Sequence, residues 1–160
     1  MSFLGYFNRK DPGFFEFPTP YRSKYRPIIM IKPLPLLFIR LTIALSFFVH
    51  GLVRIPKIAT FTQYMLARFE PTFLPKGIII LFSYALPFAE FTIGLLLLLG
   101  LFTRQALALG CVLMLCLVWG TALIEDWASL PTQFIHIAFM AFLLNALPQN
   151  SYAMDNLIKK

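Results

Sequence analysis

The chain has 160 residues, of which 59% are apolar types and only 13% are charged. A soluble domain has about a quarter charged residues, and a small one cannot bury this much apolar surface. The composition therefore excludes a soluble single domain, a disordered tail and a disulfide-framed mini-protein. The length allows about four membrane spans of roughly 20 residues each.

The formal charge of +7 would suggest a nucleic-acid partner in a soluble protein. Here most basic residues flank apolar runs, where they meet lipid headgroups. We therefore expect the lipid bilayer to be the partner of these charges and expect no nucleic-acid binding.

Residues 1–33 are rich in proline, aromatic and basic residues. Proline at this density blocks regular helix, and aromatic and basic side chains suit the headgroup layer. We expect an interfacial arm on the cytoplasmic side. Two interpretations stay open: the arm rests in the headgroups, or it docks onto other membrane protein subunits.

Four apolar runs follow, at about 34–53, 77–100, 105–124 and 131–147, and residues 148–160 form a short polar tail. Residues 54–76 are more polar, and Ile58, Phe61, Met65 and Phe69 form a stripe at helical spacing. This stripe predicts a short amphipathic helix on the membrane surface. The fold class is an all-α membrane protein: residues 34–147 form a four-helix transmembrane bundle, with the short interfacial helix between spans 1 and 2.

Four spans place both termini on one side of the membrane. That side would carry nine Lys and Arg residues outside the spans, against four on the other side. Because basic residues favour the cytoplasmic side, we expect a multi-pass protein of the inner (cytoplasmic) membrane with both termini in the cytoplasm.

Ionisable residues inside the spans need a partner, because hydrocarbon does not solvate charge. At 1.5 Å per residue, Arg40 would lie about 9 Å deep from the cytoplasmic side and Glu90 about 15 Å deep. These depths predict an Arg40–Glu90 ion pair between spans 1 and 2. Asn145, near the cytoplasmic end of span 4, could hydrogen-bond to the same group.

The two histidines would form a second layer near the opposite face. His50 and His136 both fall roughly 6–8 Å from that surface by the same rise per residue. Equal depth on two helices is a necessary condition for bis-histidine ligation of haem b, although it is far from sufficient.

Three interpretations of these polar residues stay open. They could serve only to fix helix packing. They could line a quinone or lipid-like pocket, since His50, Glu90 and Arg40 offer the donors and proton-carrying groups that a quinone ring needs. The third possibility, which we consider the weakest, is haem b held by His50 and His136.

Motifs for catalysis are otherwise missing from the sequence. It has no phosphate loop, nucleophile elbow, His-Glu-x-x-His motif or dinucleotide fingerprint. Two histidines and one buried glutamate are too few for a typical metal site, so no metal is expected.

Two blocks of residues resemble the DoxX family of small four-span membrane proteins. The first block has an arginine early in span 1 and a His-Gly-x-x-basic motif at its end, which here are Arg40, His50, Gly51 and Arg54. The second has Ala-Glu in span 2, two glycines around a leucine run and a Thr-Arg turn, which here are Ala89, Glu90, Gly94, Gly100, Thr103 and Arg104.

This resemblance implies association with membrane redox systems, since a related protein is a subunit of a thiosulfate:quinone oxidoreductase. The family's polar positions would place a site at Arg40, His50, Glu90 and Arg104. We predict a membrane subunit or partner of a quinone-linked, respiratory-type complex. We do not expect it to catalyse a reaction alone; any reaction would be that of a quinone-linked oxidoreductase. The alternative is a purely structural or assembly subunit whose polar cluster only fixes helix packing.

Overall fold

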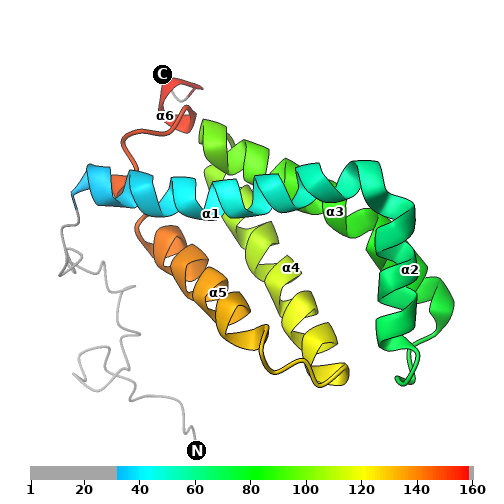
Figure 1. Ribbon diagram of the computed structural model, residues 1–160. Coiled ribbons are helices and arrows are strands. Elements are labelled where there is room, and N and C mark those ends of the chain that lie inside the picture. The colour runs from blue at the N-terminus through cyan, green and yellow to red at the C-terminus, as the bar shows by residue number, and fades with distance from the viewer. Residues whose placement is uncertain (1–31, 159–160) are drawn as a thin grey trace, which may run out of the picture.

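The computed structural model describes residues 32–158, and this part of the chain is helical (Figure 1). The elements are α1 (Pro33–Arg54), η1 (Ile55–Lys57), α2 (Ile58–Phe69), α3 (Lys76–Leu99), α4 (Thr103–Leu123), α5 (Leu130–Asn145), η2 (Leu147–Gln149) and α6 (Asp155–Ile158). The four long apolar helices begin and end within two residues of the four predicted apolar runs. The arm assigned to residues 1–33 lies outside the described residues, except for its last two positions.

Proline and glycine explain several of the helix ends. Pro33 occupies the first turn of α1, where a missing N–H costs nothing. Pro56 lies in η1, at the corner where the chain turns from α1 into α2. Gly100 ends α3 in the left-handed conformation with φ of 67°, which glycine adopts without strain.

Three helical stretches are long and apolar enough to cross a membrane: Pro33–Phe69, Lys76–Leu99 and Thr103–Leu123. α5 is also apolar but has 16 residues, so it is about 24 Å long at 1.5 Å per residue. That is somewhat less than the hydrocarbon core of about 30 Å. The chain is therefore a multi-pass membrane protein by length and composition, and a complete fourth span stays a prediction.

α1 and α3 cross in close contact at two glycines. A Cβ atom added to Gly51 would lie 2.5 Å from the carbonyl oxygen of Pro87. A Cβ atom added to Gly94 would lie 2.6 Å from the Cα of Phe48. Only glycine lets two backbones approach this closely, as small residues do in membrane bundles generally. Gly51 faces α3 near Phe91 and Gly94 faces Phe48, so the two helices run antiparallel.

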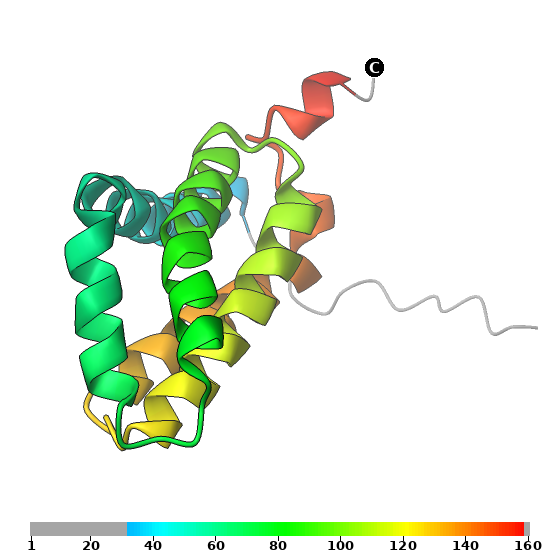
Figure 2. The ribbon, with the colours of Figure 1, turned by 90° about the vertical axis from the view of Figure 1, so that its right-hand side faces the viewer.

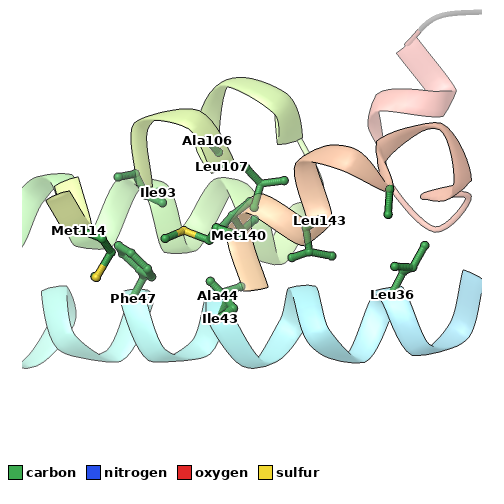
Figure 3. Packing of buried hydrophobic residues seen from close by; sticks show 12 residues of the cluster. Leu36, Ile43, Ala44, Phe47, Ile93, Ala106, Leu107, Met114, Met140 and Leu143 are labelled. Carbon is green, nitrogen blue, oxygen red and sulfur yellow. The ribbon is translucent and has the colours of Figure 1, made fainter. Parts of the chain in front are cut away.

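The apolar core lies where α1, α3, α4 and α5 meet (Figure 3). Gly110 of α4 sits against Met140 of α5, because a Cβ there would lie 2.7 Å from the Met140 sulfur. The buried apolar residues of this cluster are Leu36, Ile43, Ala44, Phe47, Ile93, Leu97, Ala106, Leu107, Met114, Met140, Leu143 and Ala146. Many large apolar side chains face outward instead, among them Leu81, Leu109, Leu115 and Phe134. This pattern suits a protein solvated by lipid.

The helix predicted between spans 1 and 2 is present, but its apolar stripe faces the protein. α2 runs beside the first half of α3 (Figure 2), and Ser83 of α3 donates a hydrogen bond to Thr62 of α2 at 3.0 Å. Phe69 is buried, and Phe61 and Met65 line a half-open cavity between the helices. The stripe is predicted to contact the membrane surface, but three of its four residues, Phe61, Met65 and Phe69, face the cavity between the helices instead. Spacing alone cannot tell these two uses of an amphipathic helix apart.

The predicted polar tail folds back onto the bundle. Both carboxylate oxygens of Asp155 accept hydrogen bonds from the first N–H groups of α4, from Phe102 at 2.7 Å and Thr103 at 2.8 Å. Asp155 therefore caps α4, whose own N-cap residue makes no side-chain bond. The first turns of α1, the α3–α4 turn and the C-terminal segment thus lie at one end of the molecule (Figure 1).

Candidate functional site

A cavity of about 440 Å³ lies at the other end of the bundle, between α1, α2, α3, α4 and α5. Its walls combine polar and apolar side chains. The polar lining residues are Ser46, His50, Arg54, Tyr64, Arg68, Glu90, Cys116, Thr121, Asp126, Ser129, Thr132, Gln133 and His136. Most of the ionisable groups within the helices therefore converge on one space.

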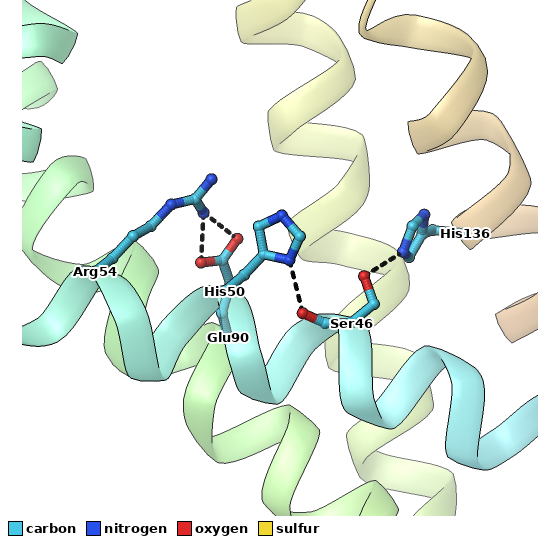
Figure 4. Close-up of polar contacts among 5 residues, drawn as sticks. All are labelled: Ser46, His50, Arg54, Glu90 and His136. Atoms are coloured by element: carbon cyan, nitrogen blue, oxygen red, sulfur yellow. Dashed lines mark hydrogen bonds and ion pairs between the residues drawn. The ribbon is translucent and has the colours of Figure 1, made fainter.

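Arg54 and Glu90 form the central ion pair of this cavity (Figure 4). One terminal nitrogen of Arg54, Nη1, donates to both carboxylate oxygens of Glu90, at 2.7 and 2.6 Å. Glu90 is almost fully buried, whereas the Arg54 side chain is 31% exposed. The guanidinium also lies 5.0 Å from the ring centre of Phe61, a cation–π contact. The pair joins α1 to α3 and touches α2.

This pairing corrects the predicted Arg40–Glu90 ion pair. Arg40 lies at the opposite end of the bundle, beside Gly100, and its two terminal nitrogens donate to Asn150 Oδ1 at 3.2 Å and the Tyr152 carbonyl at 2.9 Å. The depth estimate was wrong because it set the start of α1 level with the end of α3. α1 in fact begins about two turns, or roughly 10 Å, beyond that level.

Ser46 links the two histidines (Figure 4). The Nδ1 atom of His50 lies 2.7 Å from the Ser46 carbonyl oxygen, and the Ser46 hydroxyl lies 2.9 Å from Nε2 of His136. The Nδ1 atom of His136 lies 2.7 Å from the Thr132 carbonyl. Because a carbonyl only accepts, both Nδ1 atoms must carry the proton. In the neutral rings Nε2 is then an acceptor, so the Ser46 hydroxyl donates to His136.

A second polar group closes the cavity near the loops. Arg68 at the end of α2 donates to Asp126 in the α4–α5 connection at 2.9 Å, and Ser129 donates to the same carboxylate oxygen at 3.0 Å. Deeper in, Gln133 donates to the hydroxyl of Thr121 at 2.7 Å. These contacts tie α2, α4 and α5 together around the cavity.

Comparison with known proteins bears on this arrangement. The DoxX family profile matches residues 35–123, more than half of the chain. The chain belongs to the DoxX family. Comparisons with curated proteins and with solved structures find no match. The DoxX match includes His50, Arg54 and Glu90, whereas His136 lies beyond it.

Three of the six predicted site residues share the DoxX cavity, and three do not. His50, Glu90 and His136 line it. Arg40 binds the C-terminal segment, and Arg104 is exposed in the first turn of α4. Asn145 is exposed at the last residue of α5, and Asn150 takes the place beside Arg40 that Asn145 was expected to fill. The two histidines lie together as predicted, away from Arg40, but the prediction that Glu90 shares a layer with Arg40 is wrong, because Glu90 lies with the histidines.

The DoxX site also contains residues that the sequence prediction left out. Ser46 and Arg54 lie four residues before and after His50, so a spacing of four would have placed all three on one face of α1. Gln133 and Thr121 had no such signal. Among residues 32–158, no group of three His, Cys, Asp or Glu side chains is placed to hold a metal ion.

Proposed function

We propose that this DoxX protein is a membrane subunit or partner of a quinone-linked redox complex, and that its cavity holds the ring of a quinone-type lipid. The observation that carries the proposal is the convergence of Arg54, Glu90 and two histidines on one cavity inside an apolar bundle. Ionisable groups inside an apolar bundle are costly unless they serve a purpose, and Glu90 among these four is almost fully buried.

The size and lining of the cavity support a small amphipathic ligand. A volume of about 440 Å³ falls in the range of about 300–1,000 Å³ that is usual for small-molecule sites. Phe47, Phe61 and Phe82 contribute aromatic walls. Nη2 and Nε of Arg54 have no partner among the described residues, so Arg54 can still donate to a ring oxygen.

A tail would also have a place to lie. A second hollow, of about 220 Å³, is lined by Val49 and Val53 together with His50 and Arg54, which it shares with the cavity. Val49 and Val53 are about half exposed on the outer face of α1. A ring between His50 and Arg54 could therefore extend an isoprenoid tail along these valines toward lipid.

The same geometry favours a quinone over haem b. Bis-histidine ligation requires a free Nε2 on both rings. Nε2 of His136 already pairs with Ser46, so haem would have to break that bond. A quinone needs no change in these contacts.

The proposal extends to the setting of the protein. We propose the inner membrane with both termini in the cytoplasm, supported by the excess of basic residues on the side of the termini.

We also propose that residues 1–33 dock onto neighbouring redox subunits. A chain lacking residues 1–31 should melt like the full chain but lose those subunits in co-purification; unchanged recovery would refute docking.

The alternative is a structural or assembly subunit, which the Arg54–Glu90 pair favours by joining α1 to α3 at 2.6 Å. Removing one partner of a buried pair destabilises a protein strongly whether or not a ligand is bound. Loss of stability in a Glu90 variant therefore does not separate the two functions, and the decisive variants must leave the pair intact.

A cavity-filling substitution meets this need. Met65 lines the cavity from α2, whereas Ala67 is exposed and does not line it. The protein is purified in mild detergent, and its bound lipid is extracted and analysed for quinones. We expect quinone from the wild type and from Ala67→Trp, and at least a tenfold loss from Met65→Trp. If no quinone is ever recovered, or if Met65→Trp retains it, the structural alternative stands.

A further inference from the structure

We propose that the cavity selects the hydroxylated, reduced form of the ring, because His50 offers a ligand an unoccupied acceptor rather than a donor. This inference rests on the proposed function, since it assumes that a quinone-type ring enters the cavity. It adds which of the two redox forms binds more tightly and which residue discriminates between them.

The tautomer of His50 follows from its contact with its own helix. Nδ1 lies 2.7 Å from the Ser46 carbonyl oxygen, which is an obligate acceptor, so Nδ1 holds the proton. Nε2 of the neutral ring then carries a lone pair, and it has no partner among the described residues. The His50 side chain is exposed and lines the cavity, so a ligand can reach this lone pair.

His136 does not compete as an acceptor. Its Nε2 receives the hydrogen bond of the Ser46 hydroxyl at 2.9 Å, and its Nδ1 binds the Thr132 carbonyl. Both ring nitrogens are therefore occupied. Of the two histidines, only His50 has a nitrogen available to a ligand.

Arg54 and His50 together distinguish a hydroxyl from a carbonyl. The unpaired nitrogens of Arg54 can donate to either oxygen, since both accept hydrogen bonds. Only a hydroxyl can also donate to Nε2 of His50. A quinone carbonyl would leave that lone pair unmatched in the filled cavity, whereas a quinol would satisfy both residues.

The test measures the affinities of three ligands with the same ring and tail for the full chain in lipid nanodiscs, in the absence of oxygen. They are a decyl-tailed 1,4-benzoquinone, its quinol kept reduced, and the dimethyl ether of that quinol, which cannot donate. We expect the quinol to bind about tenfold more tightly than the other two, as one hydrogen bond allows. A tenfold preference raises the midpoint potential of the bound two-electron couple by about 30 mV.

Two variants assign the effect to His50. His50→Asn keeps a donor near the Nδ1 position but has no atom at Nε2, so the preference should vanish. His50→Gln places an amide oxygen near Nε2 and should restore part of it. Weak binding of all three ligands would refute the proposed function. Equal or tighter binding of the quinone or the ether, or an unchanged preference in His50→Asn, would overturn this inference alone; the ether comparison decides even if His50→Asn does not fold.

Discussion

The close approach of α1 and α3 at their crossing offers a sharp test of the structure through Gly94→Ala. The new Cβ atom would lie 2.6 Å from Phe48 Cα, and carbon atoms need about 3.5 Å. The helices must therefore separate by about 1 Å along their contact. Overpacking of this kind costs about 1–3 kcal/mol, and alanine recovers roughly 0.5–1 kcal/mol of helix propensity. We expect a net loss of about 1–2 kcal/mol in the free energy of unfolding.

Gly77→Ala is the matched control on the same helix. No atom lies within 4 Å of a Cβ added to Gly77. The substitution should therefore only raise the free energy of unfolding, by up to about 1 kcal/mol, through the higher helix propensity of alanine. Unfolding is measured by circular dichroism in mixed micelles with increasing denaturing detergent. Gly51→Ala should lower the free energy of unfolding by about as much as Gly94→Ala. The double variant should lower it by less than the sum of the two single effects, because one separation of the helices relieves both contacts. Equal stability of Gly94→Ala and Gly77→Ala would refute the close crossing.

Other parts of the structure give further predictions. Asp155→Ala removes the cap of α4 and should lower the free energy of unfolding by about 1 kcal/mol or more, measured in the same unfolding assay. Arg68 and Asp126 are partly exposed, so a double-mutant cycle on thermal unfolding should give a coupling below about 1 kcal/mol. Cys116 lines the cavity and Cys111 does not, so a water-soluble maleimide should label Cys116 faster. Bound quinol should slow the labelling of Cys116 alone, and mass spectrometry measures both reactions.

The helices could be predicted from the sequence because their signals are local. Apolar runs, Pro33 at the start of α1 and Gly100 at the end of α3 act within a few residues of the helix ends they define. Membership of the DoxX family is carried by motifs that are equally local. The family profile matches residues 35–123 and confirms the resemblance.

Contacts between distant segments could not be predicted in the same way. The cap of α4 comes from Asp155, more than fifty residues along the chain from Thr103, and a lone aspartate in a polar tail carries no signal of that role. The use of the α2 stripe was equally hidden. A stripe of that width fits a membrane surface and a protein interior equally well, and only the position of α3 decides between them.

The site could be predicted by residue type but not by pairing. Glu90 needs a cationic partner, and α1 offers both Arg40 and Arg54. The estimate of depth in the membrane favoured Arg40, because it assumed that the start of α1 and the end of α3 lie at the same level, which they do not. The spacing of Ser46, His50 and Arg54 on one face of α1 contained a better argument. This face of α1 already carries several polar groups that can act as partners for Glu90. A carboxylate placed anywhere else in the apolar bundle would need a separate set of polar partners.

The different surroundings of the two arginines explain why we place the proposed ligand at one end of the bundle and not at the other. Both terminal nitrogens of Arg40 are engaged by Asn150 and Tyr152, and its side chain is buried beneath the C-terminal segment. Arg54 uses one terminal nitrogen for Glu90, is 31% exposed and faces a cavity. A guanidinium with unused donors beside a free histidine nitrogen can bind something new without breaking an existing bond. Arg40 therefore joins α1 to the C-terminal segment at one end, and Arg54 at the other end is the arginine that keeps donors for the proposed ligand.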